Sequence, residues 1–112
     1  MVFKLSATGA QTVLHTFTGS DGASPGAGLL ASMGKVYGGT LAGGASNFGV
    51  LFVLSPGGEK VVHNFNGSPD GSFLESGLII DSAGNLYGTA NAGGDLSCNP
   101  PEGCGTVFRL AP

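Results

Sequence analysis

The sequence predicts an all-β fold: a β-propeller-like array of four-stranded antiparallel blades, with about two blades in the chain. Three observations support this prediction: a block of about fifty residues that recurs, glycine-rich turn signals that divide each block, and no window of useful length with helical periodicity. Of the 112 residues 22 are glycine, which contributes no side chain to a core. Each block is therefore expected to bury its apolar face against a neighbouring block.

The repeat is visible in matching segments. Residues 3–5 recur at 52–54 and again at 108–110, and residues 13–17 recur at 61–65 with both histidines and both phenylalanines kept. These matches predict one repeat domain over residues 1–112. Its first repeat spans about 2–49 and its second about 50–105, and a third begins at 106–112.

Each unit reads as four short strands, numbered here as first to fourth type: Gly-Leu-(Leu/Ile), the Tyr-Gly strand, Val/Leu-Phe-x-Leu and Val-x-His-x-Phe. Breakers such as Gly-Ser-Asp-Gly and Ser-Pro-Gly-Gly separate them. Alternation within the strands has a period of two, so Phe108 and Leu110 share one face while Val107 and Arg109 share the other. A propeller blade fits this pattern better than the alternative, a β-solenoid. Because propellers close with roughly 4 to 8 blades, two to four copies of the chain would make a ring.

The count of strand types predicts an unpaired sheet edge. The chain begins with third-type and fourth-type strands, continues with one full set of four, and ends with first, second and third types, nine strands in all. The last blade therefore lacks a fourth strand, and an open edge of this kind favours pairing with another chain. The expected assembly strands are the open one and its matching partner from another copy: Thr106, Val107, Phe108, Arg109 and Leu110, with Val13, Leu14, His15, Thr16 and Phe17.

The turn and strand sequence Gly84-Asn85-Leu86-Tyr87-Gly88-Thr89, followed by Gly93-Gly94 and then by residues 105–110, resembles the Gloeo-Verruco repeat family. The resemblance covers nearly the whole chain, although the first copy departs from it with Lys35-Val36-Tyr37-Gly38-Gly39-Thr40. It implies an exported or cell-surface bacterial protein with a tandem-repeat, propeller-like body. It implies no catalytic residues.

Cys98 and Cys104 lie in an insertion that only the second repeat carries. If the protein is exported, a local disulfide closing this loop is the favoured interpretation. A metal site and a pair of free thiols are the alternatives.

The remaining candidates favour structural roles. His15 and His63 share a face with apolar residues and are interpreted as hydrogen-bonded packing histidines, while Asp21 and Asp70 precede glycines as turn formers do. We find no arrangement typical of a catalytic site, a cofactor site or a metal site. The protein is not expected to be an enzyme.

Composition excludes two classes of partner. Four basic and seven acidic residues are scattered singly, which gives no basic stripe for nucleic acid. The longest apolar stretches fall far short of the roughly 20 residues of a membrane span, so membrane insertion is not expected.

Three functions remain open. The leading hypothesis is a non-catalytic extracellular or cell-surface structural module, whose copies join head to tail in a ring or a filament by blade or strand completion. The second is a carbohydrate-binding propeller, with Tyr37 or Tyr87 stacking on sugars. The third is a fragment of a longer cell-surface repeat protein of unknown activity.

Overall fold

The computed structural model describes residues 1–26, 28–68, 70–74 and 77–111, and its regular structure within these ranges is β-strand. The strands form three antiparallel sheets with the orders β1-β2, β3-β4-β5-β6 and β7-β8-β9. Their bounds are β1 (Val2–Leu5), β2 (Gln11–His15), β3 (Leu30–Ser32), β4 (Lys35–Gly39), β5 (Val50–Ser55), β6 (Gly58–Asn64), β7 (Ile79–Ile80), β8 (Leu86–Ala90) and β9 (Thr106–Leu110). One complete four-stranded sheet thus lies between two partial sheets.

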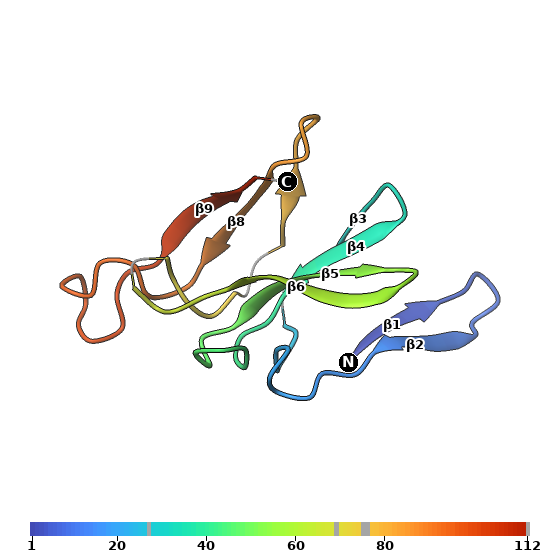
Figure 1. Cartoon of the computed structure of the whole chain (residues 1–112), viewed down its shortest axis with the longest axis horizontal. Coiled ribbons are helices and arrows are strands. Elements are labelled where there is room, and N and C mark those ends of the chain that lie inside the picture. Colours follow the sequence, from blue (N-terminus) through green and yellow to red (C-terminus); the bar gives the residue numbers. More distant parts are fainter. Residues whose placement is uncertain (27, 69, 75–76, 112) are drawn as a thin grey trace.

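The three sheets follow one another in chain order (Figure 1). The β1-β2 hairpin lies at one end of the molecule, the four-stranded sheet in the middle, and β7-β8-β9 at the other end. Strand β9 pairs with β8 on one side, and no strand among the described residues pairs with its other side. The expected open edge beside Thr106–Leu110 is therefore present in the described structure.

The partial sheets repeat the pairing of the complete one. In the complete sheet Leu51 pairs with His63 and Phe52 with Val61, with a register shift between the two pairs. In the first sheet Val2 pairs with His15 and Phe3 with Val13, with the same shift. Strand β1 therefore corresponds to β5, and β2 corresponds to β6, residue for residue.

Two apolar cores hold neighbouring sheets together. One lies between the first and middle sheets and is formed by Val2, Val50, Phe52 and Leu54, with Phe17, Val36 and Val61 packed against them. The other lies between the middle and last sheets and is formed by Leu51, Phe65, Leu74, Leu78, Leu86 and Ala90. The middle sheet is covered on both faces, whereas each outer sheet is covered on one.

The predicted strand positions hold, with differences at their ends. Strand β9 coincides with the predicted segment 106–110 and shows the expected alternation of half-buried and exposed side chains. The predicted strand 13–17 is displaced, because β2 ends at His15 and Phe17 turns inward to pack on Phe52. The last residue of the third repeat, Pro112, lies outside the described residues, as does Pro69 of the Ser-Pro-Asp-Gly turn. None of the described segments forms a helix that could cross a bilayer.

Candidate assembly site

Each histidine is joined to the aspartate of the loop that follows it. His15 Nε2 lies 2.8 Å from Asp21 Oδ2, and His63 Nε2 lies 2.8 Å from Asp70 Oδ2. The other carboxylate oxygen of each aspartate accepts a backbone N–H, from Thr18 in the first loop and from Asn66 in the second. The prediction of hydrogen-bonded packing histidines thus describes both sites, and the aspartates are the partners that it did not name.

A phenylalanine two residues after each histidine connects one sheet to the next. Phe17 packs edge-on against His15 and against Phe52 of the middle sheet, with ring centroids 4.6 and 5.0 Å apart. Phe65 packs in the same way against His63 and against Phe108 of the last sheet, at 4.7 and 5.2 Å. The histidine, aspartate and phenylalanine therefore form a repeated joint between successive sheets.

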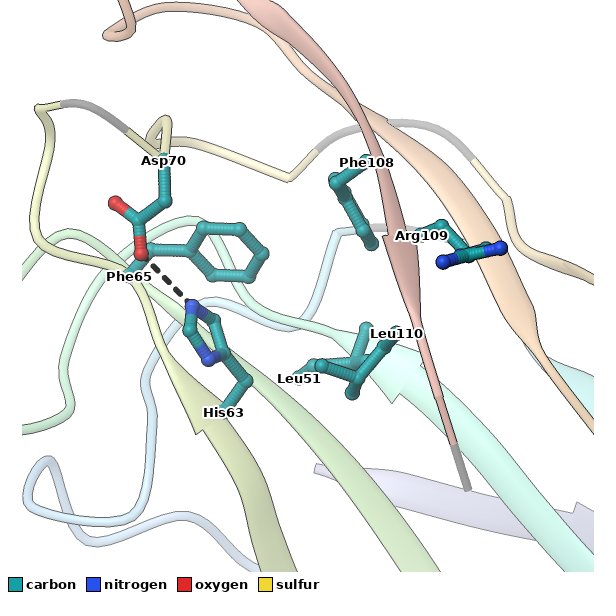
Figure 2. A pocket seen from close by; sticks show the side chains of 7 residues that line it. All are labelled: Leu51, His63, Phe65, Asp70, Phe108, Arg109 and Leu110. Atoms are coloured by element: carbon teal, nitrogen blue, oxygen red, sulfur yellow. Dashed lines mark hydrogen bonds and ion pairs between the residues drawn. The ribbon is translucent and has the colours of Figure 1, made fainter.

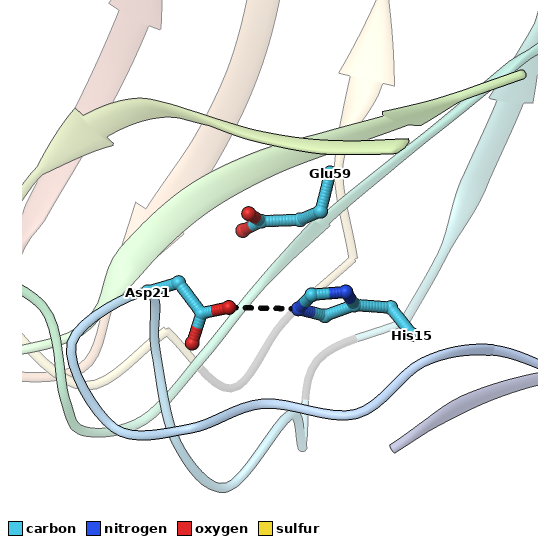
Figure 3. Close-up of side chains that lie close together, drawn as sticks. All are labelled: His15, Asp21 and Glu59. Carbon is cyan, nitrogen blue, oxygen red and sulfur yellow. Dashed lines mark hydrogen bonds and ion pairs between the residues drawn. The ribbon is translucent and has the colours of Figure 1, made fainter. Parts of the chain in front are cut away.

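The first joint contains a third polar side chain from the neighbouring sheet. Glu59, at the start of β6, faces the His15–Asp21 pair (Figure 3). Its Oε2 atom is buried and has no hydrogen-bond partner among the described residues. Burial and the negative charge of Asp21 raise the pKa of Glu59, although His15 acts in the opposite direction.

Asp21 behaves differently from Glu59. Burial acts to raise its pKa, but hydrogen bonds from the Thr18 backbone, from His15 and from the Thr18 side chain together lower it. Asp21 is therefore the ionised partner of the joint, and the histidine Nε2–H donates to it.

The three side chains of the first joint are also the described group that comes nearest to a metal site. One ligand atom each from His15, Asp21 and Glu59 lies within 4.8 Å of the other two. However, two ligands on one zinc ion at about 2.1 Å stand roughly 3.4 Å apart in a tetrahedral site. The 2.8 Å between His15 Nε2 and Asp21 Oδ2 is instead the distance of a hydrogen bond, so these two atoms are not arranged as two ligands of one zinc ion.

The second joint has a cavity at the place where the first has Glu59. A cavity of about 150 Å³ lies beside the His63–Asp70 pair and the open edge of β9, and Leu51, Phe65, Phe108, Arg109 and Leu110 complete its lining. Figure 2 shows His63 hydrogen-bonded to Asp70 on one side of this space and Phe108 and Leu110 of β9 on the other. Glu59 pairs with Leu54 in the complete sheet, and Leu110 is the equivalent of Leu54. By this equivalence the cavity lies where a residue of a fourth strand beside β9 would stand, and no described residue supplies that strand.

The outer faces of the two partial sheets are apolar and exposed. The exposed apolar side chains of the first sheet are those of Phe3, Leu5 and Val13, and we call this surface the N-terminal face. The exposed apolar side chains of the last sheet are those of Ile79 and Val107, and we call this surface the C-terminal face. Phe3 is 51% exposed whereas its equivalent Phe52 is 0% exposed, and Val107 is 83% exposed whereas its equivalent Leu51 is 0% exposed.

The two tyrosines proposed to stack on sugars lie on equivalent strands of different sheets. Tyr37, on β4, packs against the core between the middle and last sheets. Tyr87, on β8, donates its hydroxyl to Asp81 at 2.9 Å. Both side chains therefore have structural contacts, and sugar stacking stays a prediction.

Cys98 and Cys104 form a disulfide, the pairing favoured from the sequence. The loop that they close is held to the sheet at Gly93, which donates to the Glu102 carbonyl and accepts from Gly105 N–H at 3.1 Å. The first repeat has the equivalent bond between Gly49 N–H and the Gly43 carbonyl, also at 3.1 Å. The insertion therefore does not displace the start of β9. This strand begins at the position that is equivalent to the start of β5, which follows the shorter loop.

Sequence reasoning missed Glu59 as a member of the first joint. It lies 44 residues after His15 in the chain, and its equivalent in the first repeat is Gln11, so the repeat pattern gives no signal for a shared acidic group.

Comparison with known families gives one result. The family model described as the Gloeobacter/Verrucomicrobia repeat matches residues 1–112. No curated protein and no solved structure matches the chain.

Proposed function

We propose that this chain, which belongs to the Gloeobacter/Verrucomicrobia repeat family, is a non-catalytic structural module that assembles head to tail with copies of itself. The contrast in burial between equivalent residues carries the proposal. Side chains that are buried in the complete middle sheet are exposed at the two ends, and they are apolar at both. Exposed apolar patches of this kind mark sites of association.

The two faces are complementary in a directional way. The N-terminal face carries the residues that a sheet turns toward the sheet before it, and the C-terminal face carries those turned toward the sheet after it. Each contact between two copies therefore joins the C-terminal end of one to the N-terminal end of the other, which is a heterologous contact. Repetition closes into a propeller-like ring if the rotation per copy permits and grows into a filament if it does not.

The disulfide supports a location outside the cytoplasm. Disulfides persist in oxidising compartments and are rare in the cytosol. We therefore place the assembly outside the cytoplasm, at the cell surface or in the medium, as the family resemblance implies.

Light scattering coupled to size-exclusion chromatography tests the proposal. The wild-type mass should rise with concentration to a multiple of the monomer mass, and negative-stain images should show rings or filaments. Val107→Lys places a charge on the C-terminal face and should keep the protein monomeric. Ser82→Lys adds the same charge on the exposed turn between β7 and β8 and should leave assembly unchanged.

Two results would contradict the proposal. One is a wild-type protein that stays monomeric and cooperatively folded at all concentrations. The other is a native gene that continues into further repeats, because a following repeat would supply the missing strand from the same chain.

A further inference from the structure

We propose that copies join by strand exchange, in which β9 of one chain replaces β1 on the β2 strand of the next chain. This inference rests on the proposed function and names the contact by which assembly occurs. The observation behind it is that β1 and β9 are the same strand type, with the sequences Val-Phe-Lys-Leu and Val-Phe-Arg-Leu. A junction between two chains has room for only one of them.

The register of the exchanged strand follows from the two pairings that the structure contains. Since β9 corresponds to β5 and β2 to β6, the pairs are Val107 with His15, Phe108 with Val13, Arg109 with Thr12, and Leu110 with Gln11 of the second copy. The equivalent of the Val50–Asn64 pair adds Thr106 with Thr16. The exchanged pairing is thus one pair longer than the pairing of β1 with β2.

Strand β9 is held in its own chain more firmly than β1. Phe108 packs on Phe65, and Thr106 Oγ1 donates to the Asp70 carbonyl at 3.0 Å. In β1 only Val2 is buried, while Phe3 and Leu5 are 51% and 62% exposed. Strand β1 is therefore the one that leaves.

The exchange also fills the cavity beside the second joint. Glu59, opposite Leu54, occupies the corresponding space at the first joint. Gln11 of the second copy, opposite Leu110, would enter the cavity beside His63 and Asp70. A neutral carboxamide both donates and accepts hydrogen bonds, so it can pair with this joint without adding a second carboxylate.

The exchange also covers Val13 of the N-terminal face and Val107 of the C-terminal face, whereas Phe3 and Leu5 leave with β1. Strand β2 brings Val13 to the place equivalent to Val61, which packs against the preceding sheet. The middle sheet of the second copy then lies on Val107, as the last sheet of one chain lies on Leu51. Each chain then contributes two complete four-stranded units to the assembly, and β1 is the surplus third-type strand.

Two cysteine experiments test the exchange on the full chain. In the first, Arg109→Cys protein is mixed with Thr12→Cys protein under mild oxidation. Opposed residues in antiparallel strands have Cα atoms about 4.5–5.5 Å apart, within the range of a disulfide. We expect a disulfide-linked heterodimer from this mixture. We expect none when Thr16→Cys replaces Thr12→Cys, because Thr16 pairs with Thr106, three residues before Arg109 in β9.

In the second experiment, Lys4→Cys combined with Thr12→Cys locks β1 onto β2 within one chain, since these residues pair in the hairpin. The locked protein should stay monomeric at concentrations at which each single variant assembles. Circular dichroism and thermal unfolding confirm that it is folded. A reductant should restore assembly, with wild type under the same reductant as the control for the native disulfide.

The outcomes separate the two proposals. If wild type assembles but the cross-link is absent, or the locked protein assembles like the single variants, strand exchange is wrong and assembly stands. If wild type never assembles, both are wrong.

Discussion

Glu59 is a carboxyl group whose environment favours its neutral form. Burial and the neighbouring Asp21 raise its pKa above the ordinary value of 4.5. The folded protein therefore binds a proton more tightly than the unfolded chain, and the stability from this group is fully present below the unfolded pKa and is lost as pH rises through the folded one. Its buried Oε2 has no partner among the described residues, which adds to the cost of the charged form.

Replacing Glu59 by glutamine, the residue at the equivalent position of the first repeat, should stabilise the protein at neutral pH. The expected gain in the free energy of unfolding is on the order of 1 kcal/mol, because the substitution removes the buried charge beside Asp21 and keeps a polar group of the same shape. The gain should disappear below about pH 4, where the carboxyl is protonated in both states. Thermal unfolding from pH 3.5 to 8 measures it, with the exposed Glu102→Gln as control. A variant that melts at or below wild type at pH 8 would show that the carboxylate is favourable.

Asp81 shows the opposite effect. Hydrogen bonds from the side chain and backbone of Asn85, from the Tyr87 hydroxyl and from the Ala83 backbone lower its pKa from 3.8 to about 2. Its contribution to stability is therefore present above the ordinary pKa and is lost as pH falls toward about 2.

We expect Asn85→Ala to raise the pKa of Asp81 more than Tyr87→Phe does, because Asn85 supplies the largest effect. A carboxyl carbon NMR titration measures both shifts. Tyr37→Phe, which removes a hydroxyl from the equivalent strand of the middle sheet, should leave the Asp81 titration unchanged. If Tyr87→Phe raised the pKa of Asp81 more than Asn85→Ala, the phenol rather than the Asn85 turn would be the main group that stabilises the ionised carboxylate.

The turns that start the strands depend on close backbone contacts. Gly49, which precedes β5, has a φ of +100°, and a Cβ there would lie 2.3 Å from the Thr40 carbonyl oxygen. Its own carbonyl accepts the Phe65 N–H at 3.0 Å. The residue therefore fixes the start of β5 and the end of β6 together.

Gly49→Ala should destabilise the protein by roughly 3 kcal/mol or more, since it combines positive-φ strain with a clash against backbone. Gly9→Ala is the matched control, because Gly9 has a φ of +90° but open space around a Cβ, and should cost only about 1–2 kcal/mol. Urea unfolding of both variants gives the difference. Equal losses would show that strain alone, without the clash, sets the cost.

The disulfide loop should contribute modestly to stability. Cross-linking a loop this short restricts the unfolded chain by roughly 2 kcal/mol. Cys98→Ser combined with Cys104→Ser should therefore lower the melting temperature while the sheet signal in circular dichroism is kept, because Gly93 still holds the loop through its backbone bonds to Glu102 and Gly105. Loss of the folded state in the double variant would show that the covalent link is needed to place β9.

The strands could be predicted from the sequence because most of them occur in two copies, which can be compared with each other. Strand β9 lies where residues 106–110 predicted it, and the cysteines pair as the spacing favoured. The joints could not be assembled in this way, because His15 meets Asp21 through a loop and Glu59 through the packing of another sheet. Alternation along a strand tells which face a side chain lies on, but not which residue of the next sheet it meets.

The whole molecule is a stack of sheets with a direction, since each sheet turns different residues toward the sheet before it and the sheet after it. Phe17 packs on Phe52, and Phe65 packs on Phe108, always from one sheet to the next. A contact between copies that continues this order joins the C-terminal end of one copy to the N-terminal end of another. An isologous dimer, by contrast, would join two identical faces.

Two blocked variants distinguish these cases. Val107→Lys blocks the C-terminal face and Val13→Lys blocks the N-terminal face, at side chains that are 83% and 50% exposed in the single chain. Each variant alone should be monomeric, because every head-to-tail contact between its copies would bury the unpaired charge of the new lysine. A 1:1 mixture still offers one intact face of each kind, so it should form a heterodimer and stop there.

Native mass spectrometry of the mixture reads this out directly, with an isotope label on one variant to identify mixed pairs. A single mixed dimer without larger species confirms a heterologous contact, because after one junction both remaining faces are blocked. Homodimers of either variant would contradict it, since they require an interface that does not contain the face substituted in that variant. Continued growth of the mixture would also contradict it, because the two lysines would then lie outside the contact that builds the assembly.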